Sequence, residues 1–288
     1  MTTAKIEFSG AENNRLAADR FGSGGQPVLF LHGGGQTRRA WDATARRVAA
    51  AGMTAIAVDL RGHGESEWVA SGNYTFADFA ADATAVFRQS AERYGRAPVA
   101  VGASLGGLAS LTAELNHGPL IDALVLVDIT PRMDPEGVAK VQGFMGERIA
   151  DGFATLEEAA QAIARYLPHR KRPASLDGLS KNLRRSPDGR YRWHWDPAFM
   201  AGARSINVGT AALMDEVSRS LSRLAVPVLL VRGMQSELVH EAHARDFVAS
   251  VPYGRTVDVG GAGHMVAGDR NDAFCAAILD FLAAREAA

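Results

Sequence analysis

Six short apolar segments, separated by segments of helical length, constrain the fold of this chain most strongly. They are PVLFLHG (27–33), TAIAVDL (54–60), PVAVGAS (98–104), ALVLVDI (123–129), PVLLVRG (227–233) and RTVDVGG (255–261). Runs of this kind, with little polar alternation, are typical of strands that are covered on both faces of a parallel sheet. The segments between them, such as FADFAADATAVFRQSAERYG (76–95), place apolar residues at helical spacing. This alternation predicts an α/β fold with a doubly wound, mostly parallel sheet.

Two further segments near the N-terminus have the character of paired strands. They are KIEFSG (5–10) and RLAADRFG (15–22), and the turn-prone AENN separates them. This arrangement predicts an antiparallel hairpin at one edge of the sheet.

The alternation of strands and helices stops between residues 130 and 222, where no apolar strand-like run occurs. Helical patterns such as EGVAKVQGFMGERIADG (136–152) and TLEEAAQAIARYL (155–167) occupy part of this span. We therefore expect residues 130–222 to form a helical cap inserted over the sheet. Residues 1–129 and 223–288 are expected to form the α/β core.

The composition excludes several classes of protein. Hydrophobic residues make up 47% of the 288 residues, which is enough for a large core. The formal net charge is −1 and there is no continuous basic stripe, so we expect no nucleic-acid partner. Neither a secretory signal pattern nor an apolar run of about 18 residues is present, so we expect a soluble, cytoplasmic protein that does not enter a membrane. The single cysteine, Cys275, lies in an apolar helical pattern and is expected in the core.

A serine in the stretch VAVGASLGGLAS (99–110) lies where an apolar run gives way to a helical segment. Gly102-Ala103-Ser104-Leu105-Gly106 matches G-x-S-x-G, in which a sharp strand-to-helix turn exposes the serine hydroxyl above the ends of the strands. By itself the stretch is equally consistent with a helix N-cap, which is a common role for serine. As a nucleophile, Ser104 needs a general base nearby, usually a histidine that a carboxylate orients.

His264 is the strongest candidate for that base among the eight histidines. It lies in the glycine-rich segment GGAGHM (260–265), directly after the last predicted strand, so we expect it at the same edge of the sheet as Ser104. The alternative is an ordinary surface histidine in a loop. The weaker candidates for the base are His32, His63 and His243.

Four motifs in this chain, in this order, resemble those of the α/β-hydrolase fold family, and the resemblance covers nearly the whole sequence. They are HGGG (32–35), DLRGHGES (59–66), VGASLGG (101–107) and GAGH (261–264). In that family the loop after the first parallel strand and the residue after the nucleophile supply the N–H groups of an oxyanion hole. The resemblance implies that the backbone amides of Gly34 and Leu105 have this role here. The alternative for HGGG is a phosphate-binding turn, but the segment lacks the lysine of a P-loop.

Two residues compete for the acid that would orient His264. Many members of the family place this acid in a G-x-x-D pattern after the penultimate strand, but Ser236 occupies that position here and Glu237 follows it. The rival is Asp128, which ends the apolar segment ALVLVDI. A carboxylate there needs a hydrogen-bonding partner, such as a histidine N–H, and some members with a helical cap carry the acid on this strand. We favour Asp128 over Glu237; a structural alternative is that Asp128 caps the segment beginning at Thr130.

Other side chains near the predicted site give less specific signals. Asp59 and Arg61 are expected to pair with each other and to brace the rim of the site. Three neighbouring cap residues are expected either to pack the cap against the core or to line an acyl pocket; they are Trp193, His194 and Trp195. Three arginines are candidate anchors for an anionic substrate; they are Arg132, Arg192 and Arg204.

Together these features predict a serine hydrolase that cleaves a small carboxylic ester, lactone or amide through an acyl-enzyme intermediate, with Ser104, His264 and Asp128 as catalytic residues. The resemblance also implies an alternative, the hydrolysis of a carbon–carbon bond in a diketone-like compound. Outside this class stand a lyase or a cofactor-free oxygenase, which would use the histidine as a base, and a receptor for a small ligand. No cofactor is expected, and no H-E-x-x-H motif or cysteine pair indicates a metal site. The expected partner is a small-molecule substrate; the sequence leaves its identity and the oligomeric state open.

Overall fold

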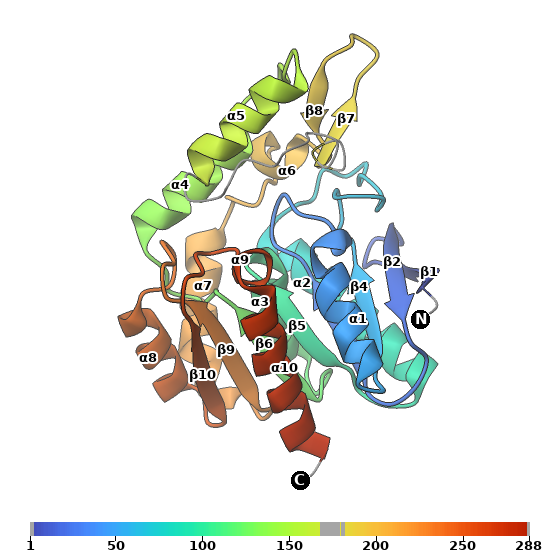
Figure 1. The fold of residues 1–288 in the computed structure, drawn as a ribbon, viewed down its shortest axis with the longest axis vertical. Coiled ribbons are helices and arrows are strands. Elements are labelled where there is room, and N and C mark those ends of the chain that lie inside the picture. The colour runs from blue at the N-terminus through green and yellow to red at the C-terminus, as the bar shows by residue number, and fades with distance from the viewer. Residues whose placement is uncertain (1–2, 168–178, 180–181, 287–288) are drawn as a thin grey trace.

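The computed structural model describes residues 3–167, 179 and 182–286 of the chain. At its centre is an eight-stranded sheet with helices on both faces (Figure 1). The strand order is β1-β2-β4-β3-β5-β6-β9-β10. The strands of this sheet are β1 (Thr3–Ser9), β2 (Arg15–Phe21), β3 (Pro27–Leu31), β4 (Thr54–Val58), β5 (Val99–Ala103), β6 (Ala123–Val127), β9 (Val228–Gly233) and β10 (Gly254–Val259).

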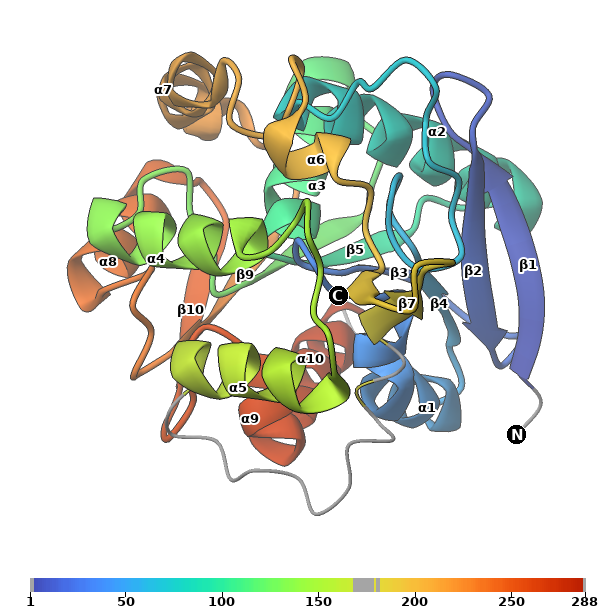
Figure 2. The same ribbon diagram turned by 90° about the horizontal axis from the view of Figure 1, so that it is seen from above.

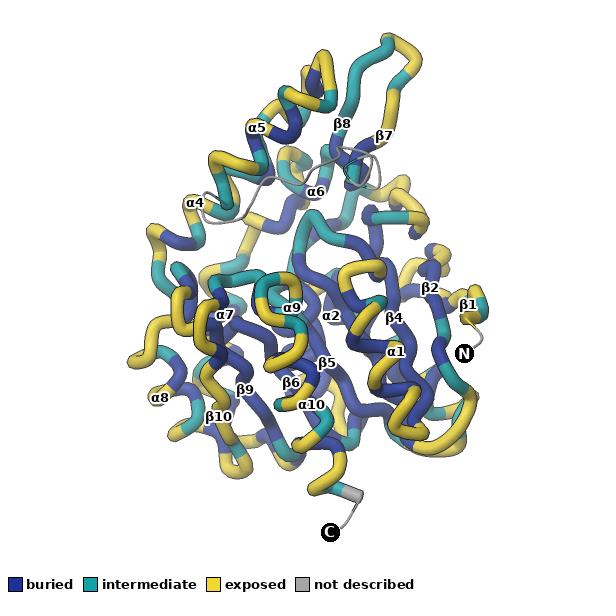
Figure 3. The backbone as a smooth tube through the Cα atoms, viewed as in Figure 1, coloured by how far each residue is buried: buried dark blue, intermediate teal, exposed yellow. Residues whose placement is uncertain are grey.

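The directions of the strands confirm the predicted fold class. β1 and β2 form an antiparallel hairpin at one edge, and β2 is also antiparallel to β4. The other neighbouring strands, from β4 to β10, pair in parallel. Every residue of β3, β4, β6 and β9 is buried, as Figure 3 shows along the middle of the sheet. Burial of whole strands is what the apolar runs predict for a sheet covered on both sides.

Helices cover the two faces of this sheet. One apolar cluster joins the sheet to α1 and α10, and the other joins it to α2, α3 and α8. α2 begins at a capping box formed by Thr75 and Asp78 and ends at Gly95, whose φ is +72°. The helical elements of the core are η1 (Arg38–Trp41), α1 (Asp42–Ala50), α2 (Phe76–Tyr94), α3 (Leu105–His117), α8 (Glu241–Ser250), α9 (Val266–Asp269) and α10 (Asn271–Glu286).

Between β6 and β9 the chain leaves the sheet and forms a separate group of elements. These are α4 (Pro135–Gly146), α5 (Leu156–Tyr166), β7 (Leu183–Arg185), β8 (Tyr191–Trp193), α6 (Ala198–Ala201), α7 (Thr210–Ser220) and η3 (Leu221–Arg223). α4, α5 and the β7–β8 hairpin lie above one end of the sheet, whereas α7 packs beside α2 and α3 (Figures 1 and 2). The sequence did not predict the hairpin, because its strands are only three residues long and polar in part.

The carboxyl ends of the parallel strands lie at the edge of the sheet beneath this inserted segment. The loop at 32–37 follows β3, Ser104 follows β5, Asp128 follows β6 and the segment 260–265 follows β10. Because parallel strands all end on the same side, four segments that are far apart in the sequence meet at this edge.

Two further expectations concern single elements. No helix in the described part of the chain combines the length and the apolar character that a bilayer span requires. Cys275 is buried on α10, as predicted for a core residue, and its sulfur lies 3.4 Å from the hydroxyl of Thr44 on α1.

Candidate active site

Ser104 lies at a strained turn between β5 and α3. Its φ of +46° and ψ of −113° are uncommon for a residue other than glycine. Close backbone packing holds the turn in place. A Cβ atom at Gly102 would lie 2.5 Å from Cα of Gly107, and one at Gly106 would lie 2.5 Å from the carbonyl oxygen of Leu31. Both glycines of the G-x-S-x-G motif are therefore required, since there is no space for a side chain.

The Ser104 side chain does not cap the helix that follows it. Ser104 occupies the N-cap position of α3, but its hydroxyl makes no capping hydrogen bond with any described residue. The residue is half-buried and lines a cavity. The N-cap explanation of this serine is wrong, because the first turn of α3 receives nothing from its side chain.

Asp128 and His264 are brought together, although 136 positions separate them in the sequence. His264 Nδ1 lies 2.9 Å from Asp128 Oδ2. Asp128 is completely buried, and its carboxylate also accepts hydrogen bonds from the backbone N–H of Gly233, at 2.8 Å, and from the hydroxyl of Ser236. Three donors thus satisfy a carboxylate that would be costly to bury alone. Asp128 also has a positive φ, +50°, at the end of its strand.

Glu237, the other candidate for the acid, makes no hydrogen bond to His264 in the described part of the chain. Ser236, which precedes it, donates its hydroxyl hydrogen to Asp128 and accepts the backbone N–H groups of Leu238 and Val239, at 3.0 and 3.1 Å. The serine at the G-x-x-D position therefore supports the carboxylate of Asp128, which follows β6. This contact is invisible in the sequence, where Ser236 shows only that the usual acid is missing.

Ser104 and His264 line the same cavity, but no direct hydrogen bond joins their side chains in this structure. In unliganded enzymes, hydrogen bonds between nucleophile and base are often long and tighten only when substrate binds. The His264 side chain is nearly buried, and the loop that carries it is fixed by a hydrogen bond from the Gly263 N–H to Asp269, at 3.1 Å.

The amides of the two residues expected to form an oxyanion hole are free in the described chain. The neighbouring amides are engaged: Gly33 N–H donates to Gln36 Oε1, at 3.0 Å, and Gly106 N–H donates to the His32 carbonyl, at 3.1 Å. Within the described chain, Gly34 N–H and Leu105 N–H have no partner. Leu105 begins α3, so its amide has no preceding helical turn to bind. Both residues line the cavity beside Ser104.

Buried histidines hold the backbone of the loop at 32–37, which follows β3 and is called the glycine-rich loop below. Each ring accepts a backbone N–H at one nitrogen and faces a backbone carbonyl with the other. For His63 these groups are Gly35 N–H, at 3.1 Å, and the Arg61 carbonyl, at 2.8 Å. For His194 they are Gly64 N–H, at 3.0 Å, and the Gly35 carbonyl, at 3.1 Å. A neutral ring whose proton faces the carbonyl satisfies both contacts.

His32 has the same arrangement, with the Leu60 N–H at 3.0 Å and the Gly33 carbonyl at 2.8 Å. Burial lowers the pKa of each of His32, His63 and His194 to about 3, because a charged ring would lose its hydration. Both nitrogens of each ring are occupied by the backbone. His32 and His63 are therefore not available as a base for Ser104, and His243 lies outside the cavity on α8.

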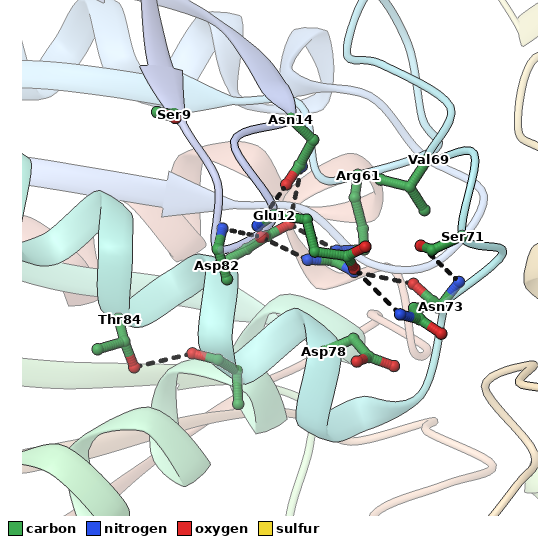
Figure 4. Close-up of polar contacts among 12 residues, drawn as sticks. Ser9, Glu12, Asn14, Arg61, Val69, Ser71, Asn73, Asp78, Asp82 and Thr84 are labelled. Carbon is green, nitrogen blue, oxygen red and sulfur yellow. Dashed lines mark hydrogen bonds and ion pairs between the residues drawn. The ribbon is translucent and has the colours of Figure 1, made fainter.

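The expected pair of Arg61 with Asp59 is wrong. Arg61 instead donates to both carboxylate oxygens of Asp82 on α2, at 2.7 and 2.6 Å, and to Glu12, at 2.8 Å (Figure 4). Asp59 pairs with Arg38. Two buried ion pairs thus brace the loop after β4. The sequence could not identify Asp82 as a partner, because it lies on a separate helix.

A cavity of about 500 Å³ lies between the sheet edge and the inserted segment. Trp193 and Trp195 line it, with their rings stacked at a centroid distance of 4.8 Å. Trp195 is also packed against Gly35, so this residue both joins the inserted segment to the core and forms part of the cavity wall.

The candidate arginine anchors do not reach this cavity. Arg192 pairs with Asp188 and Arg204 with Asp78, and neither these arginines nor Arg132 line the cavity. In residues 3–167, 179 and 182–286, no three His, Cys, Asp or Glu side chains are grouped as they would be around a metal ion.

Sequence comparisons find this chain similar to known hydrolases. The profile of the alpha/beta hydrolase fold matches residues 26–270. Esterase Rv0045c of Mycobacterium tuberculosis is 32% identical over 272 residues, which cover 92% of this chain and 85% of that protein. The 2-(acetamidomethylene)succinate hydrolase of Mesorhizobium japonicum is 29% identical over 246 residues, which cover 84% of this chain and 82% of that protein.

Solved structures show the same similarity. A crystal structure of E-2-(acetamidomethylene)succinate hydrolase superposes with a TM-score of 0.81 at 25% identity, covering 98% of this chain and 99% of the other. A structure of the M. tuberculosis esterase Rv0045c superposes with a TM-score of 0.75 at 26% identity, covering 98% of this chain and 91% of the other.

The low pKa values of the buried histidines predict how the free energy of unfolding depends on pH below about 6.5. In the folded protein the pKa of His194 is about 3, whereas an imidazole in the unfolded chain titrates near 6.5. Between these values the unfolded state binds more protons, so the free energy of unfolding falls as the pH is lowered from about 6.5 towards 3. Each such imidazole contributes a slope of at most about 1.4 kcal/mol per pH unit. His194→Gln should therefore lower this slope by up to that amount between pH 6.5 and 5, as measured by urea unfolding at several pH values.

The matched control is His117→Gln, which removes an exposed imidazole at the end of α3. A slope that falls equally in both variants, or in neither, would contradict the assignment of His194 as a ring that stays neutral in the folded protein.

Proposed function

Since the chain belongs to the alpha/beta hydrolase fold family and is a hydrolase, we propose that it cleaves a small carboxylic ester, lactone or amide through an acyl-enzyme on Ser104. The observation that carries this proposal is the hydrogen bond between His264 and the buried Asp128, at 2.9 Å, beside the cavity that Ser104 lines. Such a carboxylate fixes the tautomer of an imidazole and stabilises its protonated form.

In the first half of the proposed reaction, His264 Nε2 takes the proton of the Ser104 hydroxyl as Oγ attacks the carbonyl carbon. The carbonyl oxygen becomes negatively charged and accepts hydrogen bonds from the amides of Gly34 and Leu105. These donors are held in place before the reaction, so they favour the tetrahedral state without reorganisation. The bond to the leaving group then breaks, and His264 returns the proton to the departing alcohol or amine.

In the second half, water replaces the leaving group. His264 removes a proton from this water as its oxygen attacks the acyl carbon, and the same two amides stabilise the second oxyanion. The bond to Ser104 Oγ breaks, His264 protonates the serine, and a carboxylic acid is released. Apart from the substrate and water, these steps use only groups of the chain.

We further propose that the inserted residues 130–222 act as the cap that shapes the substrate site. Support comes from the cavity wall: α4 contributes Phe144 and Met145, and the segment around β8 contributes Trp195. The sheet edge would then supply the reacting groups, while the inserted segment determines which substrate fits.

A fluorophosphonate probe tests the nucleophile. It should label the parent protein but not Ser104→Ala, because the probe reacts with an activated serine and forms a stable adduct. Ser250→Ala, at an exposed serine on α8, is the matched control and should be labelled like the parent. Labelling is read by intact-protein mass spectrometry. A folded parent protein that takes up no probe would overturn the proposal and favour a lyase, a cofactor-free oxygenase or a receptor.

Two isosteric substitutions test the acid. Asp128→Asn should lower kcat by about 10⁴-fold, because an amide stabilises the wrong histidine tautomer. Glu237→Gln removes the charge from the neighbouring candidate and should leave kcat within about threefold of the parent. Both values are measured with one activated ester, after thermal unfolding shows that each variant is folded. The assignment of Asp128 fails if the glutamine variant is the inactive one.

A further inference from the structure

The walls of the cavity carry an inference about the substrate, which rests on the proposed hydrolase function and deepens it. We propose that the substrate carries an uncharged, flexible apolar chain next to its scissile carbonyl, and no second carboxylate. The inference is drawn from which charged and polar groups face the cavity, and from how each of them is already paired.

Among the residues that the structure describes, few charged side chains line the cavity. The described lining residues include no Asp, Glu or Lys, and the basic residues among them are Arg39 and His264. Arg39 is half exposed, and its guanidinium lies 3.6 Å from the carboxylate of Glu65. The described lining residues offer no buried arginine or lysine to a carboxylate that loses its hydration in this cavity, which disfavours its binding.

Most polar side chains in the wall bind one another or the backbone. Gln142 donates to Asn207, at 2.9 Å, and Gln36 accepts the amide of Gly33. The Thr210 hydroxyl donates to the carbonyl of residue 206. The wall also contains a donor that has no partner in the described chain, the buried Nε1–H of Trp195. Like the two amides of the proposed oxyanion hole, this donor is uncharged.

The rest of the wall is apolar and adaptable. Four methionines line the cavity, and unbranched thioether side chains fit apolar groups of different shape. These are Met133, Met145, Met200 and Met265. Aromatic and aliphatic residues from α4, α5 and α6 complete the wall. A volume of about 500 Å³ is in the range that encloses most of a small ligand.

A series of uncharged esters tests this proposal. One series consists of the acetyl, butanoyl, hexanoyl and octanoyl esters of one alcohol, and the other of the acetates of alcohols of the same lengths. In at least one of these series kcat/KM should rise with chain length. The expected rise is about fourfold for each added methylene until the cavity is filled. An adipate monoester, in which a carboxylate ends the six-carbon chain, should react more slowly than the butanoyl ester. The proposal is overturned if acetate is preferred in both series, or if the adipate monoester exceeds the hexanoyl ester.

Binding to Ser104→Ala separates this proposal from the proposed function. Isothermal titration of that variant with the hexanoyl ester and with the adipate monoester measures recognition without turnover. If the parent hydrolyses no ester but the variant still prefers the hexanoyl ester, the hydrolase proposal fails and the inference about the cavity holds. If the parent hydrolyses esters but the variant prefers the adipate monoester, the inference fails alone.

The hydrogen bonds of Gly35 carry a second inference, independent of the cavity wall. We infer that His194, which comes from the inserted segment, is a positioning residue for the proposed oxyanion hole. Its Nε2–H faces the Gly35 carbonyl, at 3.1 Å, while His63 accepts the Gly35 N–H, also at 3.1 Å. The peptide groups on both sides of Gly35 are therefore held, one by the core and one by the inserted segment. Gly34, whose amide is free, directly precedes them.

Two substitutions separate the two hydrogen bonds of His194. Glutamine can place an N–H near the position of Nε2 and keep the bond to the Gly35 carbonyl, whereas asparagine can place an oxygen near Nδ1 and keep only the bond from the Gly64 N–H. His194→Asn should lower kcat by about 10- to 100-fold with less than a threefold change in KM, because a displaced oxyanion donor acts mainly in the transition state. His194→Gln should recover most of this loss.

Active-site titration and thermal unfolding complete this test. kcat is expressed per serine that reacts with the fluorophosphonate probe, so unfolded protein does not contribute. Equal losses of kcat in both variants, tracking equal losses of thermal stability, would mean that His194 has only a structural role. Parent-like kcat in His194→Asn would likewise overturn the inference.

Discussion

The close contact between the first turn of α3 and the end of β3 determines the geometry of this site. Gly106 donates its N–H to the carbonyl of His32, and a side chain on Gly106 would collide with the backbone of Leu31. This contact fixes the strand-to-helix turn that carries Ser104 against the loop that carries Gly34. The distance between the serine and the two free amides is therefore set by packed backbone, which is stiffer than any arrangement of side chains. A larger residue at Gly106 would push the strand-to-helix turn away from the loop after β3, and so would change the distance between Ser104 and the Gly34 amide.

Charged and neutral polar groups are used in different places around this edge of the sheet. The buried arginines, Arg38 and Arg61, form ion pairs at the loop that follows β4, and neither arginine lines the cavity. Next to the glycine-rich loop, neutral imidazoles such as His63 and His194 connect backbone groups instead. A neutral ring satisfies one donor and one acceptor without bringing a charge that would itself need a partner. The edge is thus braced by several groups, while few of the described residues that line its cavity are charged.

The sequence predicted what depends on local pattern and missed what depends on tertiary partners. Continuous apolar runs identified the strands, and Ser104 and His264 could be placed at one edge because each follows a strand. The partner of Arg61 could not be predicted, since Asp82 lies on another helix and its spacing from the arginine has no local meaning. Asp128 was favoured over Glu237 from the sequence, but the support for its carboxylate was hidden: Ser236 hydrogen-bonds to Asp128, and only the folded chain shows this contact. The short β7–β8 hairpin lacked any apolar run that would predict a strand.

Side chains of the inserted segment pack closely against the glycine-rich loop. A Cβ atom on Gly34 would lie 3.2 Å from the terminal methyl group of Met145, and one on Gly35 would lie 3.2 Å from the ring of Trp195. The same two side chains form part of the cavity wall. A substitution of Met145 or Trp195 therefore changes both the shape of the cavity wall and the packing against the loop that carries the proposed oxyanion donor. Substrate preference should be freer to change through wall residues that do not touch this loop, such as Ile163 on α5, than through Met145 or Trp195.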